Sequence, residues 1–439
     1  MSHKLEMFHI GPIEQCSFCI DNFTVLTGPQ ANGKSTIAKA VYFFKTIKQD
    51  ILNIMLQGGP ASVSGNTNAT WEHTLKQRMK DKFMQLFGSS WAMQHDMHMT
   101  YTYAPGVDIH IYLDINTDTP SRNYISIDFS NKIEDYFFDL QVCNFTNMNA
   151  DQKKYQETRL NKLFADQFET VFIPAGRNLI TLLSTQLNYI FTSLDEPQLR
   201  NIDYITRRYT ELILKLKPMF SAGMNGILSD AANEPTREKL YKKNRPAIHL
   251  LMKKAYEVMG GEYRFVDGEE RLYLSSGKYV KINLASSGQQ EVIWIFNLLF
   301  YYLLEDKRFF LIVEEPESHL YPSSQQIMAE VLALMYTSKN SVLVTTHSPY
   351  ILGTFNYLLL AGQIPLEHQT DVSKRIHKRF WISPNSSNAY YIEKGTIHPA
   401  LCSDDDITLI QNELIDGAST VINEQSDFLL TYLYKQEGE

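Results

Sequence analysis

The sequence has few cysteines and no long uninterrupted apolar segment. Four cysteines in 439 residues are too few for a disulfide framework. Cys16 and Cys19 have the spacing of half a zinc site, but no second pair of ligands completes it, so we expect two buried thiols. No apolar run approaches the roughly 20 residues that a membrane-spanning helix needs, and the N-terminus lacks a signal-peptide pattern. These absences argue against a secreted or membrane protein and predict a cytoplasmic one.

The sequence also has fewer basic than acidic residues, which gives a net charge of −8. The chain as a whole is therefore not expected to bind polyanions strongly. One stretch differs, since residues 237–254 contain a single acid, Glu238, and the basic residues Arg237, Lys239, Lys242, Lys243, Arg245, Lys253 and Lys254. Such a stretch either contacts nucleic acid or an acidic partner, or forms the solvated face of a helix. The sequence leaves both interpretations open.

A glycine-rich segment near the N-terminus carries the most specific pattern. A β-prone apolar run at 22–26 precedes it, and a helix-like stretch from Thr36 to about Met55 follows. The segment matches G-x-x-x-x-G-K-[ST] at every fixed position, in the strand–loop–helix context in which this pattern binds phosphates. Lys34 would place a cation on the terminal phosphates, and Ser35 would ligate Mg²⁺. The predicted ATP-binding residues are Gly28, Pro29, Gln30, Ala31, Asn32, Gly33, Lys34, Ser35 and Thr36.

Two adjacent glutamates follow a predicted buried strand. The apolar run at 308–313 is typical of a strand covered on both faces, and Glu314 and Glu315 stand at its C-terminal end. Buried acids need partners. Glu314 would hold Mg²⁺, directly or through water, and Glu315 would orient and deprotonate the attacking water. A second apolar strand at 341–346 ends in His347, which we expect at the same edge of the sheet and near the terminal phosphate.

A short polar segment, SSGQQ at 286–290, opens a long apolar helix predicted from Glu291 to about Leu304. Serine hydroxyls and a glycine at a helix N-terminus are suited to binding an anion. Ser-Ser-Gly is also common capping chemistry. Taken alone, the segment does not decide between a phosphate contact and a helix cap.

The remaining pattern predicts alternating strand and helix regions. These are a surface loop at 57–68, antiparallel strands at 107–115 and 125–129 with a turn at 119–121, a buried strand at 170–173, mostly helical structure at 178–259, and a strand pair at 262–265 and 272–274. Near the C-terminus, the acidic triplet at 404–406 is expected to cap a helix that begins at Ile407.

Four motifs in order, GPQANGKST, SSGQQ, VEEPESHLYP and VTTHSP, resemble those of the ABC-type ATPases of the SMC, RecF and OLD group. The resemblance covers roughly 1–56 and 262–400. It implies an α/β P-loop NTPase fold of ABC type, with a mixed central sheet, an antiparallel β subdomain and an inserted helical lobe. It also implies that Ser287 and Gly288 complete the active site of a second subunit, that residues 317–322 cross the dimer interface, and that His347 is the switch histidine. A homodimer or a higher even-numbered oligomer follows from this arrangement.

Two positions depart from the family pattern. Arg177 stands where the glutamine of the Q-loop is expected, and it is either a sensor of the γ-phosphate or part of a structural ion pair. Glu314 stands where transporters carry aspartate. The Glu-Glu-Pro-Glu form resembles OLD-type and phage-defence ATPases.

The expected division of the chain follows from these motifs. It comprises an N-terminal half of the ATPase core at 1–177, a helical lobe at 178–261, a C-terminal half of the core at 262–400 and a helical extension at 401–439. The stretch between the two halves carries no sustained heptads, which argues against a coiled-coil arm. No nuclease-like unit follows the second half.

These features together predict a stand-alone ATPase that controls a separately encoded effector, either a nuclease or a toxin. In this respect the chain resembles the ATPase subunits of two-component anti-phage systems such as PARIS and Septu. The alternative is a RecF-like DNA-repair ATPase that acts as an ATP-dependent DNA clamp. A transporter motor is disfavoured by the atypical signature.

Overall fold

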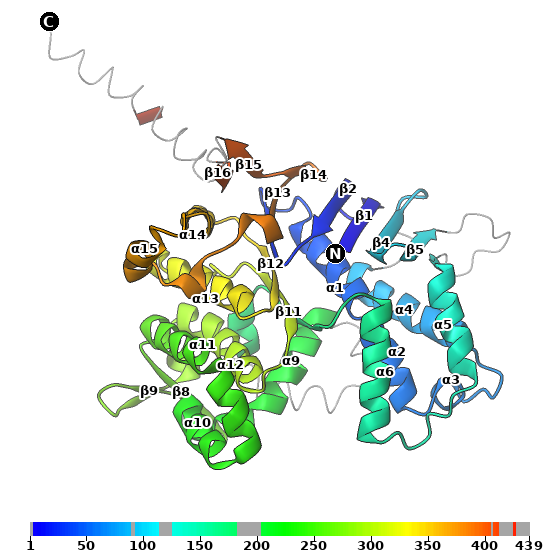
Figure 1. Cartoon of the computed structure of the whole chain (residues 1–439), viewed down its shortest axis with the longest axis horizontal. Helices are drawn as coiled ribbons and strands as arrows, with labels where there is room; N and C mark the ends of the chain where they lie inside the picture. Colours follow the sequence, from blue (N-terminus) through cyan, green and yellow to red (C-terminus); the bar gives the residue numbers. More distant parts are fainter. Residues whose placement is uncertain are drawn as a thin grey trace, which may run out of the picture.

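A mixed sheet of eleven strands runs through the molecule (Figure 1). The computed structural model describes residues 3–88, 93–113, 125–181, 203–404, 407–411 and 425–426. Across the sheet the strands are β6 (Ile125–Phe129), β5 (Val107–Leu113), β4 (His98–Ala104), β1 (His3–Ile10), β2 (Ile13–Ile20), β14 (Thr396–Pro399), β13 (Ser387–Glu393), β3 (Phe23–Thr27), β12 (Ser341–Thr345), β11 (Phe309–Glu314) and β7 (Glu169–Ile173).

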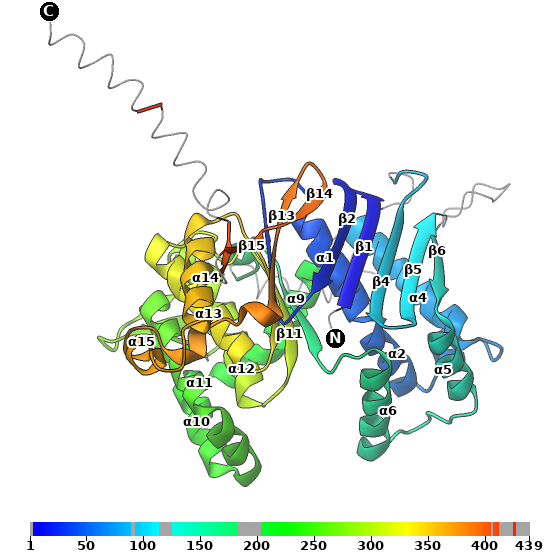
Figure 2. The same cartoon turned by 45° about the horizontal axis from the view of Figure 1, so that its top comes forward.

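The sheet has an antiparallel part and a parallel part, and Figure 2 shows the antiparallel strands side by side. In β5, buried residues alternate with more exposed ones, as expected for a strand with one face on the core. In the parallel part, β13, β3, β12, β11 and β7 lie next to one another. All residues of β3, β11 and β12 are buried. The strands predicted at 107–115, 125–129, 170–173, 308–313 and 341–346 are thereby confirmed with small differences at their ends, except that residues 114–115 lie outside the described residues.

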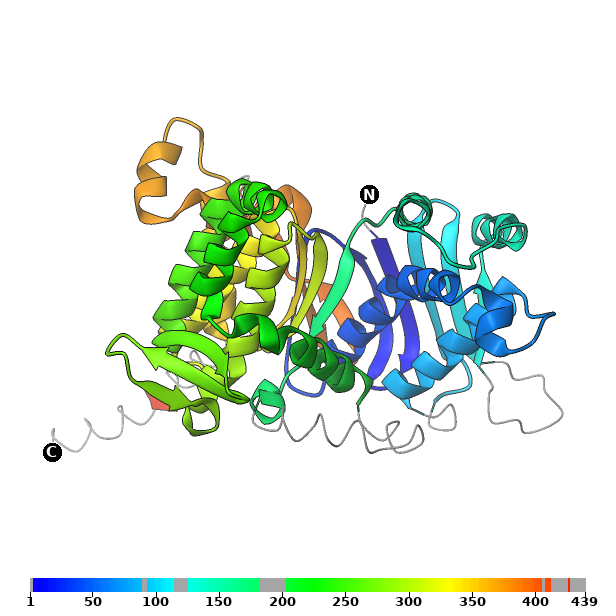
Figure 3. The ribbon, with the colours of Figure 1, turned by 90° about the horizontal axis from the view of Figure 1, so that it is seen from below.

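Helices cover the sheet in two groups, which Figure 3 shows toward opposite ends of the molecule. The first group is α1 (Lys34–Lys45), α2 (Ile47–Leu56), α3 (Pro60–Ser64), α4 (Trp71–Phe87), α5 (Asn131–Gln141) and α6 (Ala150–Leu163). The second group is α10 (Gly223–Asn233), α11 (Pro235–Met259), α12 (Ser287–Leu304), α13 (Pro322–Thr337), α14 (Pro349–Gly362) and α15 (Gln369–Arg375). Helix α9 (Tyr204–Leu216) lies between the two groups, where it contacts α4 and β7. A small antiparallel sheet of β8 (Gly261–Val266), β9 (Glu269–Leu274) and β10 (Tyr279–Lys281) adjoins the second group.

The parallel strands separate two hydrophobic cores. Phe309, Leu311 and Val313 of β11 pack into the core that contains α12, α13 and α14. Phe310 and Ile312, on the other face, pack into the core that contains α1 and the antiparallel strands. Successive side chains of a strand point to opposite faces, so a strand between two cores must be apolar at every position.

Three local predictions differ from the structure. The helix predicted from Thr36 to Met55 begins at Lys34 and is divided at Thr46, whose hydroxyl donates to the backbone oxygens of Tyr42 (2.8 Å) and Phe43 (3.1 Å). The loop predicted at 57–68 contains the short helix α3. The turn predicted at 119–121 lies outside the described residues.

The helix predicted to begin at Ile407 is wrong, because that residue starts a strand. β15 (Leu401–Asp404) and β16 (Ile407–Ile410) pair as an antiparallel hairpin. Asn356 of α14 accepts from the N–H of Ile410 (2.7 Å) and donates to its carbonyl oxygen (3.0 Å). The amide side chain thus satisfies backbone groups that a helix would have paired internally. Within the described residues, no helix has both the length and the apolar character needed to cross a bilayer.

Candidate functional site

The glycine-rich loop joins the C-terminal end of β3 to the N-terminus of α1. Gly28 and Gly33 have positive φ angles of 138° and 100°, which favour glycine. A Cβ atom at Gly28 would also lie 2.1 Å from the backbone oxygen of Ile392, so no larger residue fits. The first bond of the helix runs from the N–H of Ile37 to Gly33. The N–H groups before Ile37 precede the helical ladder and are suited to an anion.

The other loop residues are held or exposed in different ways. Pro29, Gln30 and Ala31 are exposed at the tip of the loop, and Thr36 is half-buried in the first turn of α1. The side chain of Asn32 accepts from the N–H of Lys394 at 2.7 Å and so ties the loop to the turn between β13 and β14.

Lys34 is buried and folded back onto its own loop. Its Nζ donates to the backbone oxygens of Gly28 (2.7 Å) and Pro29 (2.8 Å). Burial lowers the pKa of Lys34, and the nearby carboxylates of Glu315 and Glu317 oppose that shift. The ammonium group therefore donates to two backbone carbonyl oxygens. Phosphate oxygens are stronger acceptors and are able to take the place of these carbonyls as partners of Lys34.

Glu314 lies beside Ser35 and is 6% exposed. Oε2 accepts from the N–H of Ala175 at 3.3 Å, whereas Oε1 has no hydrogen-bond partner among the described residues. Burial raises the pKa of Glu314, and a hydrogen bond with Ser35 opposes the shift. A hydroxyl and a carboxylate with a free buried oxygen are the hard oxygen ligands that suit Mg²⁺. These two residues therefore fit a divalent cation.

Glu315 follows directly and has a strained backbone, with a φ angle of 43°. Its N–H donates to the carbonyl oxygen of Thr345 at 2.9 Å, which anchors it to the end of β12. Oε1 lies 4.0 Å from Nδ1 of His347, and both side chains are partly exposed. The carboxylate of Glu315 and the imidazole of His347 therefore lie next to one another at the edge of the sheet. A strained backbone such as that of Glu315 is often found at functional sites.

Glu317 is a part of the site whose role the sequence did not indicate. Its buried Oε1 accepts from the hydroxyl of Thr346 (2.8 Å) and from the N–H of His347 (2.9 Å). The imidazole Nδ1 of His347 lies 3.4 Å from the same oxygen. Glu317 thus fixes the backbone at His347. The third acid of the Glu-Glu-Pro-Glu sequence was the signal available for it.

The segment at 286–290, called the signature segment below, caps the N-terminus of α12, and its two serines are exposed. The hydroxyl of Ser286 accepts from the N–H of Gln289, and the side chain of Gln289 bonds back to the N–H of Ser286, which forms a capping box. Ser287 is exposed and Gly288 is half-buried. The atoms nearest to a Cβ at Gly288 belong to His319 and Leu320, and not to the phosphate loop of the same chain. A helix cap and a phosphate contact are therefore compatible in this segment, because Ser286 caps the helix and Ser287 is exposed to solvent.

Arg177 is fully buried and forms an ion pair. Its Nε lies 3.0 Å from Oε2 of Glu291, a residue of α12, although the contact lacks the geometry of an aligned hydrogen bond. The guanidinium also donates to the backbone oxygens of Pro174 (2.7 Å), Glu314 (2.6 Å) and Glu315 (2.9 Å). Of the two interpretations of Arg177, the structure supports the ion pair.

Glu291, which the sequence did not single out, joins three elements. Its Oε1 accepts from the N–H of Asn178 at 3.1 Å and lies 3.5 Å from Nδ1 of His319. Through Arg177 it also reaches the carbonyl groups at the end of β11. The start of the signature helix is thus linked to the predicted catalytic glutamate and to the loop at 317–322.

The basic stretch at 237–254 lies on α11, and most of its charges are paired. Carboxylates lie within 4 Å of Arg237, Lys242, Lys243, Lys253 and Lys254. Several of these acids, including Glu305, Asp306 and Glu330, come from other elements of the fold. The excess positive charge of the sequence is therefore largely balanced at this surface.

The chain is similar to solved structures of SMC head domains. One is the Smc head domain with an extended coiled coil bound to the C-terminal domain of ScpA from Pyrococcus furiosus, with 12% identity, 97% of this chain and 99% of that chain covered, and a TM-score of 0.38. Another is the SMC head domain from Thermotoga maritima, with 10% identity, coverage of 93% and 98%, and a TM-score of 0.35.

Among curated proteins, none matches the chain. A family model described as AAA ATPase domain matches residues 11–352, which include the phosphate loop, the signature segment, both glutamates and His347. The chain therefore belongs to the AAA ATPase domain family.

Proposed function

We propose that the chain is an ATP-driven switch that dimerises around ATP, hydrolyses it and controls a separately encoded effector. One observation carries the proposal. Lys34, Ser35, Glu314 and Glu315 gather at the carboxyl ends of β3 and β11, whereas Ser287 is exposed and the neighbouring Gly288 lies against His319 of the loop at 317–322. A second copy of the chain would supply the missing contact.

The chemistry follows from the side chains. Lys34 would exchange the two loop carbonyls for β- and γ-phosphate oxygens, and the N–H groups at the start of α1 would bind the same phosphates. Ser35 and Glu314 would hold Mg²⁺, which neutralises developing charge on the phosphates when it is bound. Glu315 would orient the attacking water and accept its proton. His347, held by Glu317, would bond the terminal phosphate.

Exposed apolar side chains support the dimer. Tyr321 is 76% exposed and Leu284 is 73% exposed, and Tyr350 is exposed as well. Tyr321 belongs to the loop at 317–322, Leu284 precedes the segment at 286–290, and Tyr350 follows His347. Apolar side chains exposed around a functional face are typical of an interaction surface. ATP would join the two subunits, because its phosphates would meet helix N-termini from both.

The effector and the anti-phage role rest on resemblance to stand-alone ATPase subunits of defence systems. We expect the neighbouring gene to encode a nuclease or a toxin that co-purifies with the chain. The DNA-clamp alternative depends on the basic stretch at 237–254, whose charges are mostly paired, and so it has less support. Replication or recombination genes in the neighbourhood would favour that alternative.

The shared site is tested by mixing two inactive variants. Lys34→Ala removes the phosphate-binding cation. Gly288→Asp would bring its Cβ within 2.8 Å of the backbone oxygen of His319 and so displace the loop at 317–322, which makes Ser287→Asp the cleaner variant of the segment at 286–290. At position 287, near the N-terminus of α12, the aspartate carboxylate interacts favourably with the helix dipole, so the helix itself is not destabilised. The same carboxylate would repel the γ-phosphate of ATP bound to the partner subunit. Each variant alone should be inactive.

In a mixed dimer, one site combines the intact Lys34 of the Ser287→Asp chain with the intact signature of the Lys34→Ala chain. An equal mixture should therefore regain ATPase activity, measured as phosphate release. Light scattering and differently tagged chains establish that mixed dimers form. If mixed dimers form and remain inactive, or if Ser287→Asp hydrolyses ATP at the normal rate as a monomer, the shared-site mechanism is wrong.

A further inference from the structure

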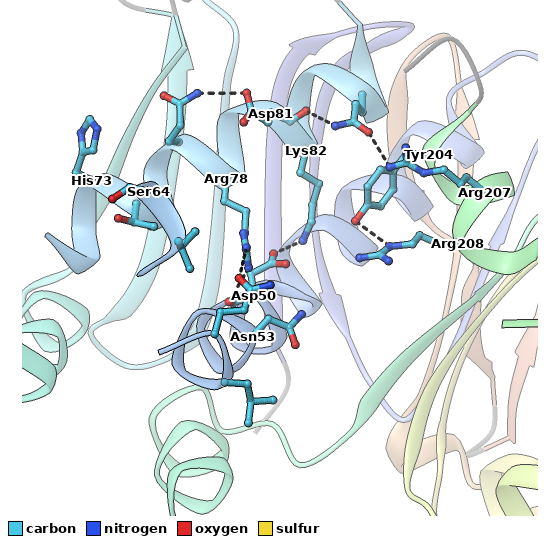
Figure 4. Close-up of a pocket in the computed structure, with 16 residues that line it drawn as sticks. Asp50, Asn53, Ser64, His73, Arg78, Asp81, Lys82, Tyr204, Arg207 and Arg208 are labelled. Atoms are coloured by element: carbon cyan, nitrogen blue, oxygen red, sulfur yellow. Dashed lines mark hydrogen bonds and ion pairs between the residues drawn. The ribbon is translucent and has the colours of Figure 1, made fainter. Parts of the chain in front are cut away.

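A second polar cavity lies between α2, α4 and α9, away from the phosphate loop (Figure 4). Its volume is about 700 Å³, within the range of small-molecule sites. Arg78 and Lys82 come from α4, Arg207 and Arg208 come from α9, and Asp50 comes from α2. None of the predicted ATP-binding residues lines it.

Two of the four cations are neutralised within the protein. Lys82 forms a buried ion pair with Asp50. Arg208 lies 3.0 Å from a carboxylate oxygen of Glu211, one turn further along α9. These ion pairs are part of the cavity wall, and they leave little uncompensated positive charge on Lys82 and Arg208 for a ligand.

The other two cations donate their hydrogen bonds to neutral groups among the described residues. Arg78 donates to the backbone oxygen of Asp50 (3.4 Å) and to the side chain of Gln57 (3.2 Å). Arg207 donates to the side chain of Gln85 (3.2 Å), and its Nε, 4.0 Å from Glu211, makes no hydrogen bond within the described chain. Two guanidinium groups on opposite walls therefore face the cavity without a hydrogen-bonded carboxylate among the described residues.

We propose that this cavity binds a compound with two or more phosphate groups. The planar guanidinium fork matches phosphate oxygens in pairs. Two such forks on opposite walls, here Arg78 and Arg207, suit a ligand with several anionic oxygens rather than a single carboxylate. Asp81, the exposed acid of the lining, bonds Gln77 and lies on the side of α4 away from Arg207 in the close-up.

Inorganic pyrophosphate is the probe, and calorimetric titration of the full chain measures it. The Lys34→Ala background silences the phosphate loop, so that binding there does not obscure the cavity. One pyrophosphate per chain is expected. Arg78→Gln and Arg207→Gln, added singly, should each weaken binding at least about tenfold, because each removes a charge-assisted contact.

Arg159→Gln is the matched control, since Arg159 pairs with Asp139 at the surface of α5 and α6 and should not affect the titration. No pyrophosphate binding by Lys34→Ala, or equal binding by the Arg78 and Arg207 variants, would overturn the proposal.

Discussion

The ion pair of Arg177 with Glu291 should dominate the stability of the region between the signature helix and β11. Both side chains are fully buried. Arg177→Met would leave a buried carboxylate without its cation and three backbone oxygens without their donor. Removing one partner of a buried pair costs about 3–5 kcal/mol, a large share of the 5–15 kcal/mol by which native proteins are stable.

Glu291→Gln is expected to cost less than Arg177→Met. The amide oxygen still accepts from the N–H of Asn178, and the guanidinium keeps its three carbonyl acceptors. In the double variant no charge is left unpaired, so its loss should be smaller than the sum of the two single losses. The difference, the coupling energy, should be about 1–3 kcal/mol.

Urea unfolding followed by tryptophan fluorescence measures these energies, because Trp294 is buried one turn from Glu291 on α12. Additivity of the two substitutions within about 0.5 kcal/mol would refute the reasoning. ATP binding provides a second criterion. A stable Arg177→Met protein that binds ADP normally and ATP weakly would support a γ-phosphate sensor instead of a structural ion pair.

The other predictions concern binding, turnover and pH. Lys34→Ala should abolish ATP binding in a fluorescent-nucleotide titration, and tight binding at physiological salt would contradict the assigned site. Glu315→Gln should bind ATP, fail to hydrolyse it and accumulate as a dimer in light scattering; a monomer with ATP bound would contradict the shared site. If α11 binds duplex DNA, log affinity should fall with log salt by about 0.9 for each phosphate neutralised, and the double change of Lys242 and Lys243 to Glu should flatten that slope; an unchanged slope would leave α11 a solvated face. Burial lowers the pKa of His3 to about 3, so below pH 6.5 the unfolded chain takes up a proton that the folded chain does not. Stability should fall by about 2 kcal/mol between pH 7 and 5, and unfolding of His3→Gln should show a dependence flatter by that amount.

Local patterns predicted the elements that carry the site. The phosphate loop was recognisable because its glycines, lysine and serine are contiguous and depend on backbone geometry within a few residues. β11 and β12 were recognisable because strands covered on both faces are apolar at every position, which few other elements are. The glutamates and the histidine were then expected at one edge, since parallel strands end on the same side of a sheet.

The C-terminal hairpin shows where such reasoning ends. Ile407 follows acidic residues that suggest a helix cap, yet it begins β16 because α14 supplies Asn356 and Gln363 to the backbone of the hairpin. A local capping preference is worth about 1 kcal/mol, and several bonds from a neighbouring element outweigh it. Those bonds come from residues far along the chain.

The sequence by itself determined the buried strands beside the site, where the phosphate loop lies and which acids end β11, because each depends on neighbours along the chain. Only the tertiary structure decided the partners of charges. Arg177 met Glu291, five of the basic residues at 237–254 met carboxylates within 4 Å, and Arg78 and Arg207 came to face one cavity. Electrostatic interaction depends on distance and burial, and folding sets both for residues that are far apart in the chain.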